Sequence, residues 1–468
     1  MTISEVKEKF NNVFSSDFDF RVATGKVGDS DAAFFYIEGM IDKELLSMIM
    51  KSLAKVERPE RENVENCASP AEIKVIEDFD EAVKSVVNSS VVMFFNEGFY
   101  EIPIVKFEKR SIQEPPTSSV IKGPRAGFVE DISINTTLLR RRLKSERLRI
   151  KSLTVGKYTT TTVCVCYIEG IAKQKIVDTV TERISSVKID GIIDSEYIAE
   201  LIEDNKSSIF PQTASQEKPD VVTAKLLEGR IAIIVDGSPM VLTLPHLLLE
   251  NFQDGDDYYK RKHRASFTRI LRLLGLFMAT LLPALYVAVQ EYQYQLIPLK
   301  FMITVINATN GTPLSPAFEM FLVLILFDVL NEASVRMPKY VGMALSIVGA
   351  IVLGETAVSA GLLSSPSVLI MALSAIGMYT SPNNIGTFTL IRLLLLALAS
   401  VFGICGVLTG IFVFVAHIAN LKSFDVDYTA PYSPVVISDL KDGFVKGSLS
   451  SMKTRPRSIP NDDPVRQK

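Results

Sequence analysis

The distribution of hydrophobic positions divides the chain into three unequal parts. Residues 1–265 mix apolar and charged positions, residues 266–420 are mostly apolar, and residues 421–468 are polar again. Ile270–Gln290, at the start of the apolar part, reads ILRLLGLFMATLLPALYVAVQ and carries one charge, Arg272. A helix of this length extends about 30 Å, the thickness of the hydrocarbon core of a bilayer. The pattern therefore predicts a membrane-spanning helix.

The remaining apolar segments predict an all-α polytopic transmembrane bundle within 256–420. We expect four full crossings, near 270–290, 314–333, 340–363 and 393–418, and two partial segments, at 296–308 and 366–380. An even number of crossings places the N-terminal part and the tail on one side of the membrane. If both partial segments cross, the count is six and the side of the tail is unchanged.

Basic residues before the first crossing indicate which side that is. No acidic residue follows Asp257 before the crossing, whereas six cations precede or begin it: Lys260, Arg261, Lys262, Arg264, Arg269 and Arg272. Lys and Arg accumulate on the cytoplasmic side of membrane proteins. The first residues, MTISEVKEKFNNVF, lack the apolar core of a signal peptide. We therefore expect residues 1–265 and the tail 421–468 to be cytoplasmic.

The polar N-terminal part contains an internal repeat. The sequence YIEG occurs at 36–39 and again at 167–170, each time at the end of an apolar run and before a helical pattern. Further matches occur at the same offset of 131: Gly25-Lys26 with Gly156-Lys157, Phe79 with Phe210, Val91 with Val222, and Glu97-Gly98 with Glu228-Gly229. Repeats at one offset indicate a duplicated unit. We interpret YIEG as a structural turn, because no phosphate-binding glycine motif accompanies it and Glu38 and Glu169 would repel an anion.

Each copy reads as a strand, a helix and then a hairpin. The hairpin signals are VVMFFNEGFYEIPIV in the first copy and VVTAKLLEGRIAIIVDG in the second. The sequence thus predicts an α+β cytoplasmic region of two duplicated α/β subdomains, followed by the transmembrane bundle. The predicted boundaries are 1–110 for subdomain 1, 111–149 for a Pro/Gly loop and basic connecting helix, 150–255 for subdomain 2, 256–420 for the transmembrane domain, and 421–468 for the tail.

The connecting helix should begin near Asp131 or Ser133 and should carry a basic run: Arg140, Arg141, Arg142, Lys144, Arg147 and Arg149. No aromatic residue interleaves with these cations, which argues against nucleic-acid binding. A solvated helix face or an inter-subunit surface explains the run better.

Composition argues against an enzyme or a metalloprotein. The net charge is −3, and the three histidines, His246, His263 and His417, are far apart in the sequence. Cys164 and Cys166 lack a second ligand pair and are expected to pack in the core. His417 is expected to be a packing or interface residue. We therefore predict no catalytic residues, no cofactor and no metal.

Charged residues inside the bundle are candidate functional groups, because they are costly in a bilayer. The candidates are Glu319, Asp328, Glu332 and Arg336, and Glu332 with Arg336 forms a possible i,i+4 pair. They would line an ion path, or they would pair between helices or subunits. For Asp328, Glu332 and Arg336 the structural pairing is favoured.

The segment 340–363 is the better candidate for a pore. On a helical wheel, one arc of about 100° holds its polar groups and two valines: Val348, Val352, Glu355, Thr356 and Ser359. Such a stripe, with an apolar ring at the valines, suits a gate that closes by dewetting. Glycines at 342, 349, 354 and 361 equally suit close helix packing within one chain. Both interpretations remain open.

Four long segments resemble one known family. They are VIKGPRAGFVEDISINTTLLRRRLK, GRIAIIVDGSPMVLTLPHLLLENFQDGDDYY, LLPALYVAV and SIVGAIVLGETAVSAGLLSSP. They are similar to the A subunit of the GerA-type spore germinant receptors, and the resemblance covers about 20–435. Asp328 departs from the family pattern, in which this membrane acid is Glu.

The resemblance implies a membrane subunit of a nutrient germinant receptor that triggers bacterial spore germination from the spore inner membrane. It implies a transporter-like B subunit and a lipoprotein C subunit as partners, and a homo-oligomer that forms a ligand-gated ion channel. The alternative is a scaffold or signal-transducing subunit that does not itself conduct. Neither reading involves nucleic acid.

Overall fold

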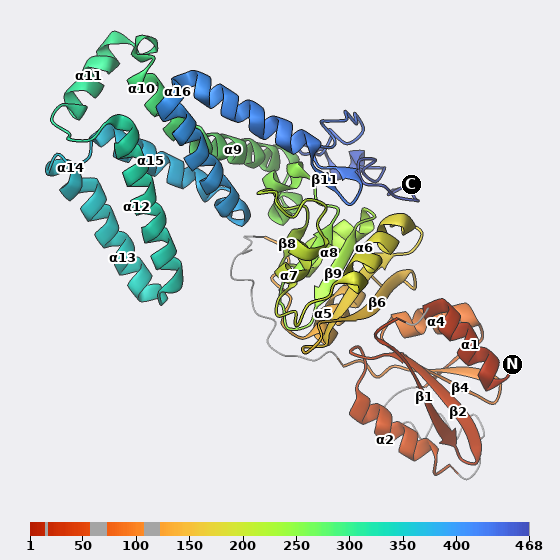
Figure 1. Ribbon diagram of the computed structural model, residues 1–468. Helices are drawn as coiled ribbons and strands as arrows, with labels where there is room; N and C mark the ends of the chain where they lie inside the picture. The colour runs from red at the N-terminus through yellow and green to blue at the C-terminus, as the bar shows by residue number, and fades with distance from the viewer. Residues whose placement is uncertain (15–16, 57–72, 107–121, 468) are drawn as a thin grey trace.

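The computed structural model describes residues 1–14, 17–56, 73–106 and 122–467; the first part of the predicted Pro/Gly loop, up to residue 121, lies outside these ranges. Figure 1 shows two α/β units in the N-terminal half and a bundle of helices beyond them. The α+β class with two duplicated subdomains, followed by a helical part, is confirmed.

Subdomain 1 is a five-stranded antiparallel sheet with the strand order β1-β2-β4-β5-β3. Successive side chains of a strand face opposite sides, so Phe34 meets the helix α2 while Phe35 meets α1 and α4. The elements are α1 (Ile3–Phe14), β1 (Phe20–Val27), β2 (Ser30–Ile37), α2 (Lys43–Leu53), β3 (Lys74–Ile76), α4 (Phe79–Val87), β4 (Val91–Phe95) and β5 (Gly98–Ile102).

Subdomain 2 repeats this order as β6-β7-β9-β10-β8. Helices α6 and α7 cover one face of the sheet, and α5 and α8 cover the other. The elements are α5 (Ile132–Arg142), β6 (Leu148–Val155), β7 (Thr161–Ile168), α6 (Gln174–Ser186), α7 (Ser195–Ile202), β8 (Ala214–Gln216), α8 (Pro219–Leu227), β9 (Ile231–Val235) and β10 (Val241–Leu244). Cys164 and Cys166 are buried on the α5/α8 face, as the core interpretation predicts.

The offset between the two copies is not constant. Strands β2 and β7 begin at 30 and 161, a shift of 131, whereas α4 and α8 begin at 79 and 219, a shift of 140. Most of the matches counted at 131 therefore join residues in different elements. Val91 begins β4 while Val222 lies in α8, and Gly25 lies in β1 while Gly156 follows β6. Phe79 begins α4 whereas Phe210 lies between α7 and β8, and Glu97 lies between β4 and β5 whereas Glu228 follows α8. Of the matches at offset 131, only YIEG therefore joins positions that are equivalent in the two folds.

The second predicted hairpin is also wrong, because VVTAKLL forms helix α8. Pro219 occupies the first turn, where a missing N–H breaks no helical bond. Val222 and Leu226, four positions apart, are both fully buried against the sheet. Burial at helical spacing thus outweighs the β propensity of the two valines. The hairpin instead joins β9 to β10 through Gly237.

The YIEG turns require glycine. Gly39 and Gly170 have φ of +62° and +77°, a region that other residues rarely adopt. A Cβ on Gly39 would lie 2.1 Å from the hydroxyl of Thr137, on α5. The first YIEG turn is therefore a contact between subdomain 1 and the connecting helix.

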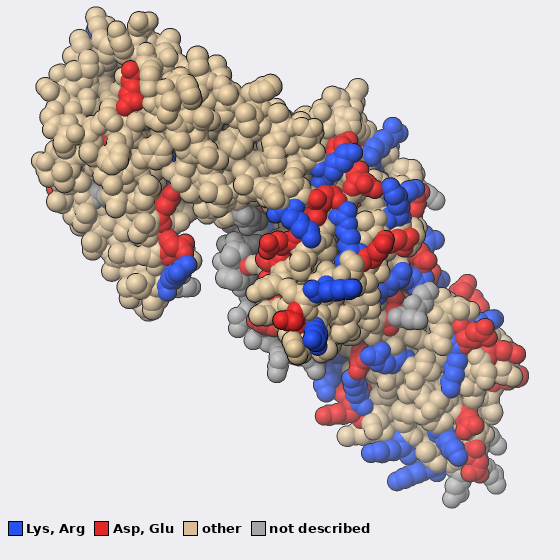
Figure 2. All heavy atoms as spheres, viewed as in Figure 1, with Lys and Arg blue, Asp and Glu red and all other residues tan. Residues whose placement is uncertain are grey.

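The helical part begins after two 3₁₀ turns, η1 (Leu248–Phe252) and η2 (Gly255–Tyr259). Its segments are α9 (Lys262–Thr280), α10 (Leu282–Glu291), η3 (Tyr294–Leu296), α11 (Leu299–Thr309), α12 (Pro316–Arg336), α13 (Lys339–Ile351), the π-helical turn η4 (Val352–Thr356), α14 (Ala357–Ser359), α15 (Ser365–Met378), η5 (Pro382–Asn384) and α16 (Ile385–Asn420). Tyr340–Ser359 and Ile385–Asn420 are each long and apolar enough to cross a membrane, as are α9 and α10 together, which are bent by 45°. Figure 2 shows that this half exposes few charges on the face in view.

Helix α16 is folded back on itself. Gly403 has φ +58° and ψ −141°, outside the helical region. A Cβ on Gly410 would lie 2.6 Å from a methyl carbon of Leu395, although fifteen residues of straight helix would separate them by about 22 Å. The two halves therefore pack side by side, as the two arms of α16 in Figure 1 show. The predicted crossing at 393–418 is thus not one continuous helix.

The C-terminal tail, with β11 (Lys422–Ser423), β12 (Val426–Asp427) and the 3₁₀ turn η6 (Leu449–Ser451), packs on subdomain 2. Phe424, Val426 and Ile459 are buried in the same core as α6 and α7. Ala172, which follows the second YIEG turn, forms a β-bridge with Asn461. The tail is therefore a structural part of subdomain 2 rather than a free extension.

Candidate functional site at the junction of subdomain 2, helix α9 and the tail

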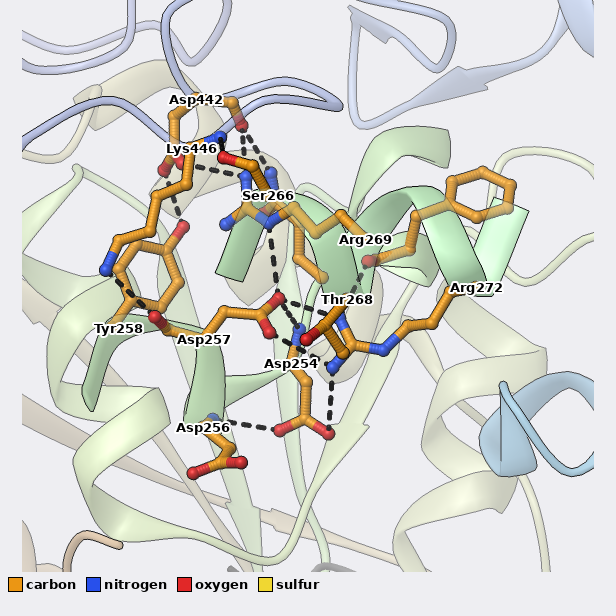
Figure 3. A network of polar contacts seen from close by, with 12 residues as sticks. Asp254, Asp256, Asp257, Tyr258, Ser266, Thr268, Arg269, Arg272, Asp442 and Lys446 are labelled. Atoms are coloured by element: carbon orange, nitrogen blue, oxygen red, sulfur yellow. Dashed lines mark hydrogen bonds and ion pairs between the residues drawn. The ribbon is translucent and has the colours of Figure 1, made fainter. Parts of the chain in front are cut away.

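A buried network of charges joins the last turn of subdomain 2 to the first helix of the bundle (Figure 3). Asp257, from η2, is fully buried. Its carboxylate accepts hydrogen bonds from Arg269 Nε at 3.2 Å and from Arg272 Nη1 at 2.7 Å. Both arginines lie on α9, and Arg269 is fully buried as well. The network fixes the direction in which α9 leaves subdomain 2.

The tail completes this network from the other side. Arg269 Nη1 donates to Asp442 Oδ1 at 2.9 Å and to the carbonyl of Gly443 at 2.7 Å. Tyr258 Oη donates to Asp442 Oδ2 at 2.6 Å. Lys446 Nζ donates to the carbonyl of Asp257 at 2.8 Å. Figure 3 shows these side chains converging from η2, from α9, which follows it, and from the tail, about 170 residues later in the sequence.

Burial and charge shift the titration of two groups in this network. The pKa of Tyr258 is raised well above its usual range, because the phenol is buried and lies beside the Asp442 carboxylate. Burial lowers the pKa of Lys446, against the opposing effect of Asp442. These groups act as hydrogen-bond donors that tie the tail to η2.

A second charge cluster lies behind the first, within subdomain 2. The Glu250 carboxylate forms ion pairs with Lys225 Nζ, 2.9 Å from Oε2, and with Arg230 Nη1, 2.5 Å from Oε1. Burial alone would raise the pKa of Glu250, but the charges of Arg230, Lys225 and His246 hold it well below its usual range. The adjacent Asn251 accepts a hydrogen bond from Ser381, in the turn before α16. This cluster therefore connects the sheet of subdomain 2 to the turn between α15 and α16.

A cavity of about 740 Å³ lies between these parts. It is lined by α8, by the η1 and η2 turns, by the turn at 380–384 and by the tail. Its wall combines acidic, basic and aromatic side chains, including Lys218, Asp220, Glu250, Tyr258 and Tyr259. Among the residues that the structure describes, no group of three or more His, Cys, Asp or Glu side chains is arranged to hold a metal ion.

A loop of subdomain 2 touches both ends of the folded-back helix α16. Thr387 Oγ1, near its start, donates to the carbonyl of Ile209 at 2.9 Å. His417, near its end, lies 3.2 Å from Ser208 Oγ and packs near the ring of Phe210. His417 is thus an interface residue, as predicted, and both ends of α16 rest on subdomain 2.

The intramembrane charge candidates separate into three environments. Asp328 forms a two-pronged pair with Arg392 of α16, at 2.8 Å for each oxygen, and Arg392 is fully buried. Glu332 and Arg336 form the predicted i,i+4 pair at 2.5 Å, and both are exposed. Glu319 is buried and accepts a hydrogen bond from the backbone N–H of Ser364, in the turn that begins α15. Asp328 therefore has its counter-charge on another helix of the same chain.

All five candidate pore-lining residues are exposed on the single chain: Val348, Val352, Glu355, Thr356 and Ser359. Val348 and Val352 are 54% and 49% exposed, and Glu355 lies in the π-helical turn. Helix α13 packs against α12, where a Cβ on Gly349 would approach Leu330 at 2.9 Å. A Cβ added at Gly354 or Gly361 would meet no atom of another described segment within 4 Å. One chain therefore packs one side of α13 and leaves the stripe uncovered.

The basic run begins in the last turn of α5, continues beyond it to Arg149, and does not form one solvated face. Arg140 is 1% exposed and pairs with Asp17 and Asp19 of subdomain 1, with nitrogen–oxygen distances of 2.8–2.9 Å. Arg149 is buried and pairs with Glu169, in the second YIEG turn, at 2.8 Å. The expectation of a solvated face is wrong for these two residues, because both join subdomains or turns. Lys144 and Arg147 are exposed.

Comparison with known proteins assigns the chain to a family. A family model described as the Bacillus/Clostridium GerA spore germination protein matches residues 4–458. The chain belongs to this GerA family.

The chain is 34% identical to spore germination protein KA of Bacillus subtilis, over 99% of this chain and 87% of that protein. It is 37% identical to the uncharacterized membrane protein YfkQ of Bacillus subtilis, over 90% of this chain and 84% of that protein. Among solved structures, the N-terminal domain of the A subunit of the Bacillus megaterium spore germinant receptor GerK3 matches 53% of this chain and 95% of its own, with a TM-score of 0.43 and 27% identity.

The junction residues were not identified as a site from the sequence, although this GerA-family chain carries a local signal for them. The acidic stretch at 254–257 directly precedes six cations, and charges of opposite sign at short spacing favour pairing. No comparable signal links Asp442 or Lys446 to this region, since about 170 residues intervene. Arg392 is likewise a lone charge at the start of an apolar run.

Proposed function

We propose that this chain is a membrane subunit of a nutrient germinant receptor that triggers bacterial spore germination. The proposal rests on the match to the GerA family across residues 4–458. In this role the subunit is not an enzyme and works in the spore inner membrane with a transporter-like B subunit and a lipoprotein C subunit. Deleting the gene in spores and measuring germination with single nutrients tests this role; unchanged germination with every nutrient would exclude it.

The subdomains and the tail are proposed to lie together on the cytoplasmic side. Subdomain 2, the start of α9, the turn at 380–384 and the tail meet at one junction, so they share one side of a membrane. The exposed cations at the start of α9 favour the cytoplasmic side. Cysteine accessibility measured in intact membranes at Lys188 and at Gln295 tests the orientation, since these positions should be labelled from opposite sides.

The bundle is proposed to cross the membrane six times. Helix α15 runs from Ser364, near Glu319 at the start of α12, to Ser381 at the junction, so it passes from one end of the bundle to the other. The two halves of α16 run away from subdomain 2 and back. With α9–α10, α12 and α13–α14 these make six segments. The even count agrees with the expected side of the tail, but the six differ from those expected from hydropathy.

The stripe on α13 and η4 is proposed to line an ion pore in a ligand-gated oligomer of this subunit. The stripe is exposed on the single chain, which supports this proposal. In a ring of subunits the stripe of each copy would face the water of a central pore rather than lipid. We expect Val352→Phe to change ion release from spores. The matched control is Met343→Phe, since Met343 is also exposed but lies nine residues earlier, on the opposite side of an ideal helix. A normal response with Val352→Phe and an altered one with Met343→Phe would place the pore elsewhere.

A scaffold that does not conduct is the second candidate. The pairing of Asp328 with Arg392 within one chain favours it, because that charge then needs no pore water. Reconstitution of the subunit alone in liposomes separates the two, since conductance excludes a pure scaffold.

A further inference from the structure

The six cations around the start of α9 fall into two groups. Lys260 pairs with Asp256, and Arg269 and Arg272 pair with Asp257. The other three, Arg261, Lys262 and Arg264, are exposed. Their side chains make no ion pair or hydrogen bond with any residue that the structure describes. The fold therefore uses half of this basic segment and leaves the other half uncompensated.

The uncompensated cations lie directly below an apolar surface. From Arg264 the helix continues with exposed large apolar side chains: Phe267, Ile270, Leu271 and Leu274. One helical turn, about 5 Å, separates Arg264 from the first of them. Exposed cations followed by exposed apolar groups along one axis match the order of phosphate groups and acyl chains in a bilayer leaflet.

Internal stability does not explain these cations. They occupy the N-terminal end of a 19-residue helix that has no acidic residue in its first turn and no side-chain N-cap bond. Cations at this end interact unfavourably with the helix dipole. The acidic residues that could compensate them, Asp256 and Asp257, are already paired.

We propose that Arg261, Lys262 and Arg264 bind the phosphate groups of anionic phospholipids in the leaflet that faces subdomain 2. This inference rests on the proposed membrane placement of α9 but not on conduction or on germinant sensing. Each cation near an anionic surface contributes about a fivefold gain in binding, so the three together contribute on the order of 100-fold. Because Arg269 lies five residues from Arg264, the lipid contact adjoins the buried network at the junction.

The test uses the purified full chain in detergent, titrated with phosphatidylglycerol or phosphatidylcholine and followed by native mass spectrometry. We expect the unaltered chain to prefer phosphatidylglycerol, and the triple variant Arg261→Gln, Lys262→Gln, Arg264→Gln to lose that preference by roughly 100-fold. The matched control replaces three other exposed cations, Lys144→Gln, Arg147→Gln and Lys188→Gln, and should keep the preference.

Three results would overturn the proposal: an unchanged preference in the triple variant, an equal loss in the control, or no headgroup preference in the unaltered chain. Lys262→Gln alone, with an expected fivefold loss, replaces the triple variant if that protein does not fold. A chain that binds phosphatidylglycerol as expected yet neither conducts nor supports germination would leave this inference standing and refute the proposed function.

Discussion

Replacing Asp257 by asparagine should detach α9 from the network at its base. The carboxylate of Asp257 compensates two guanidinium groups that are largely removed from water, since the side chains of Arg269 and Arg272 are 0% and 12% exposed. Removing one partner of a buried ion pair costs about 3 to 5 kcal/mol, because a buried charge loses its compensation. Arg269 would keep Asp442, so the cost falls mainly on Arg272. Asparagine keeps the size of the side chain, so the change isolates the charge.

Thermal unfolding in detergent measures this cost. For a cooperative unit of 150 to 250 residues each kcal/mol shifts the midpoint by about 2 to 4 °C, so Asp257→Asn should lower it by roughly 6 to 20 °C. Limited proteolysis should also cleave the tail sooner. Without the Asp257 carboxylate, Arg269 is held less firmly in the position from which it donates to Asp442 of the tail. Glu332→Gln is the control, since it breaks an exposed pair worth less than about 1 kcal/mol. Equal midpoints for the two variants would refute the importance of the junction.

Three further predictions concern the bundle and subdomain 2. Asp328→Asn should destabilise the chain by about 3 to 5 kcal/mol, because it leaves Arg392 buried without a counter-charge. The double variant Asp328→Asn, Arg392→Met should recover part of the lost thermal midpoint. No recovery in the double variant would contradict this reasoning. Gly403→Ala should lower the free energy of unfolding by about 1 to 3 kcal/mol, because φ is +58° and the added carbon would lie 2.9 Å from Gln293. Gly354→Ala is the control and should be near neutral, because the added carbon would meet open space. The reverse order of their unfolding midpoints would be inconsistent with a reversal at Gly403. The pKa of Glu250 is held well below 4.5 in the folded chain, so the stability it contributes is present above about pH 4.5 and falls as the pH drops below that value. Glu250→Gln should flatten this dependence in unfolding measured from about pH 6 to about pH 3. An unchanged slope would show that other carboxylates account for the acid sensitivity.

The features that the sequence predicts correctly are local. Asp131 caps α5 where the helix was expected to begin, because a side-chain cap acts within three residues. The Glu332–Arg336 pair follows from helical spacing alone. The YIEG turn marks the duplication because a tight turn with positive φ demands glycine in both copies.

The features that it does not predict depend on contacts between distant segments. The pairing of Arg140 with Asp17 and Asp19 spans more than 120 residues and has no periodic signal. The reversal at Gly403 lies inside an apolar run, and hydropathy is the same for one long helix as for two short ones. The offset between the copies is 128 at β1 and β6, 131 at β2 and β7, and 140 at α4 and α8, because loop lengths differ. Matching at a fixed offset of 131 therefore failed on both sides of the YIEG turn.

The attachment of the bundle at both of its ends has a mechanical consequence. One residue, Leu421, separates the end of α16 from strand β11, and it is buried. At the other end, Asp257 and Arg269 hold α9 rigidly to η2. Neither connection contains a flexible linker, so a rotation of subdomain 2 would move both attached helices. Torque applied to the sheet would turn the first and last helices of the bundle together. Helix α12 would follow α16, because Asp328 pairs with Arg392, whereas α13 packs mainly against α12 rather than against α16.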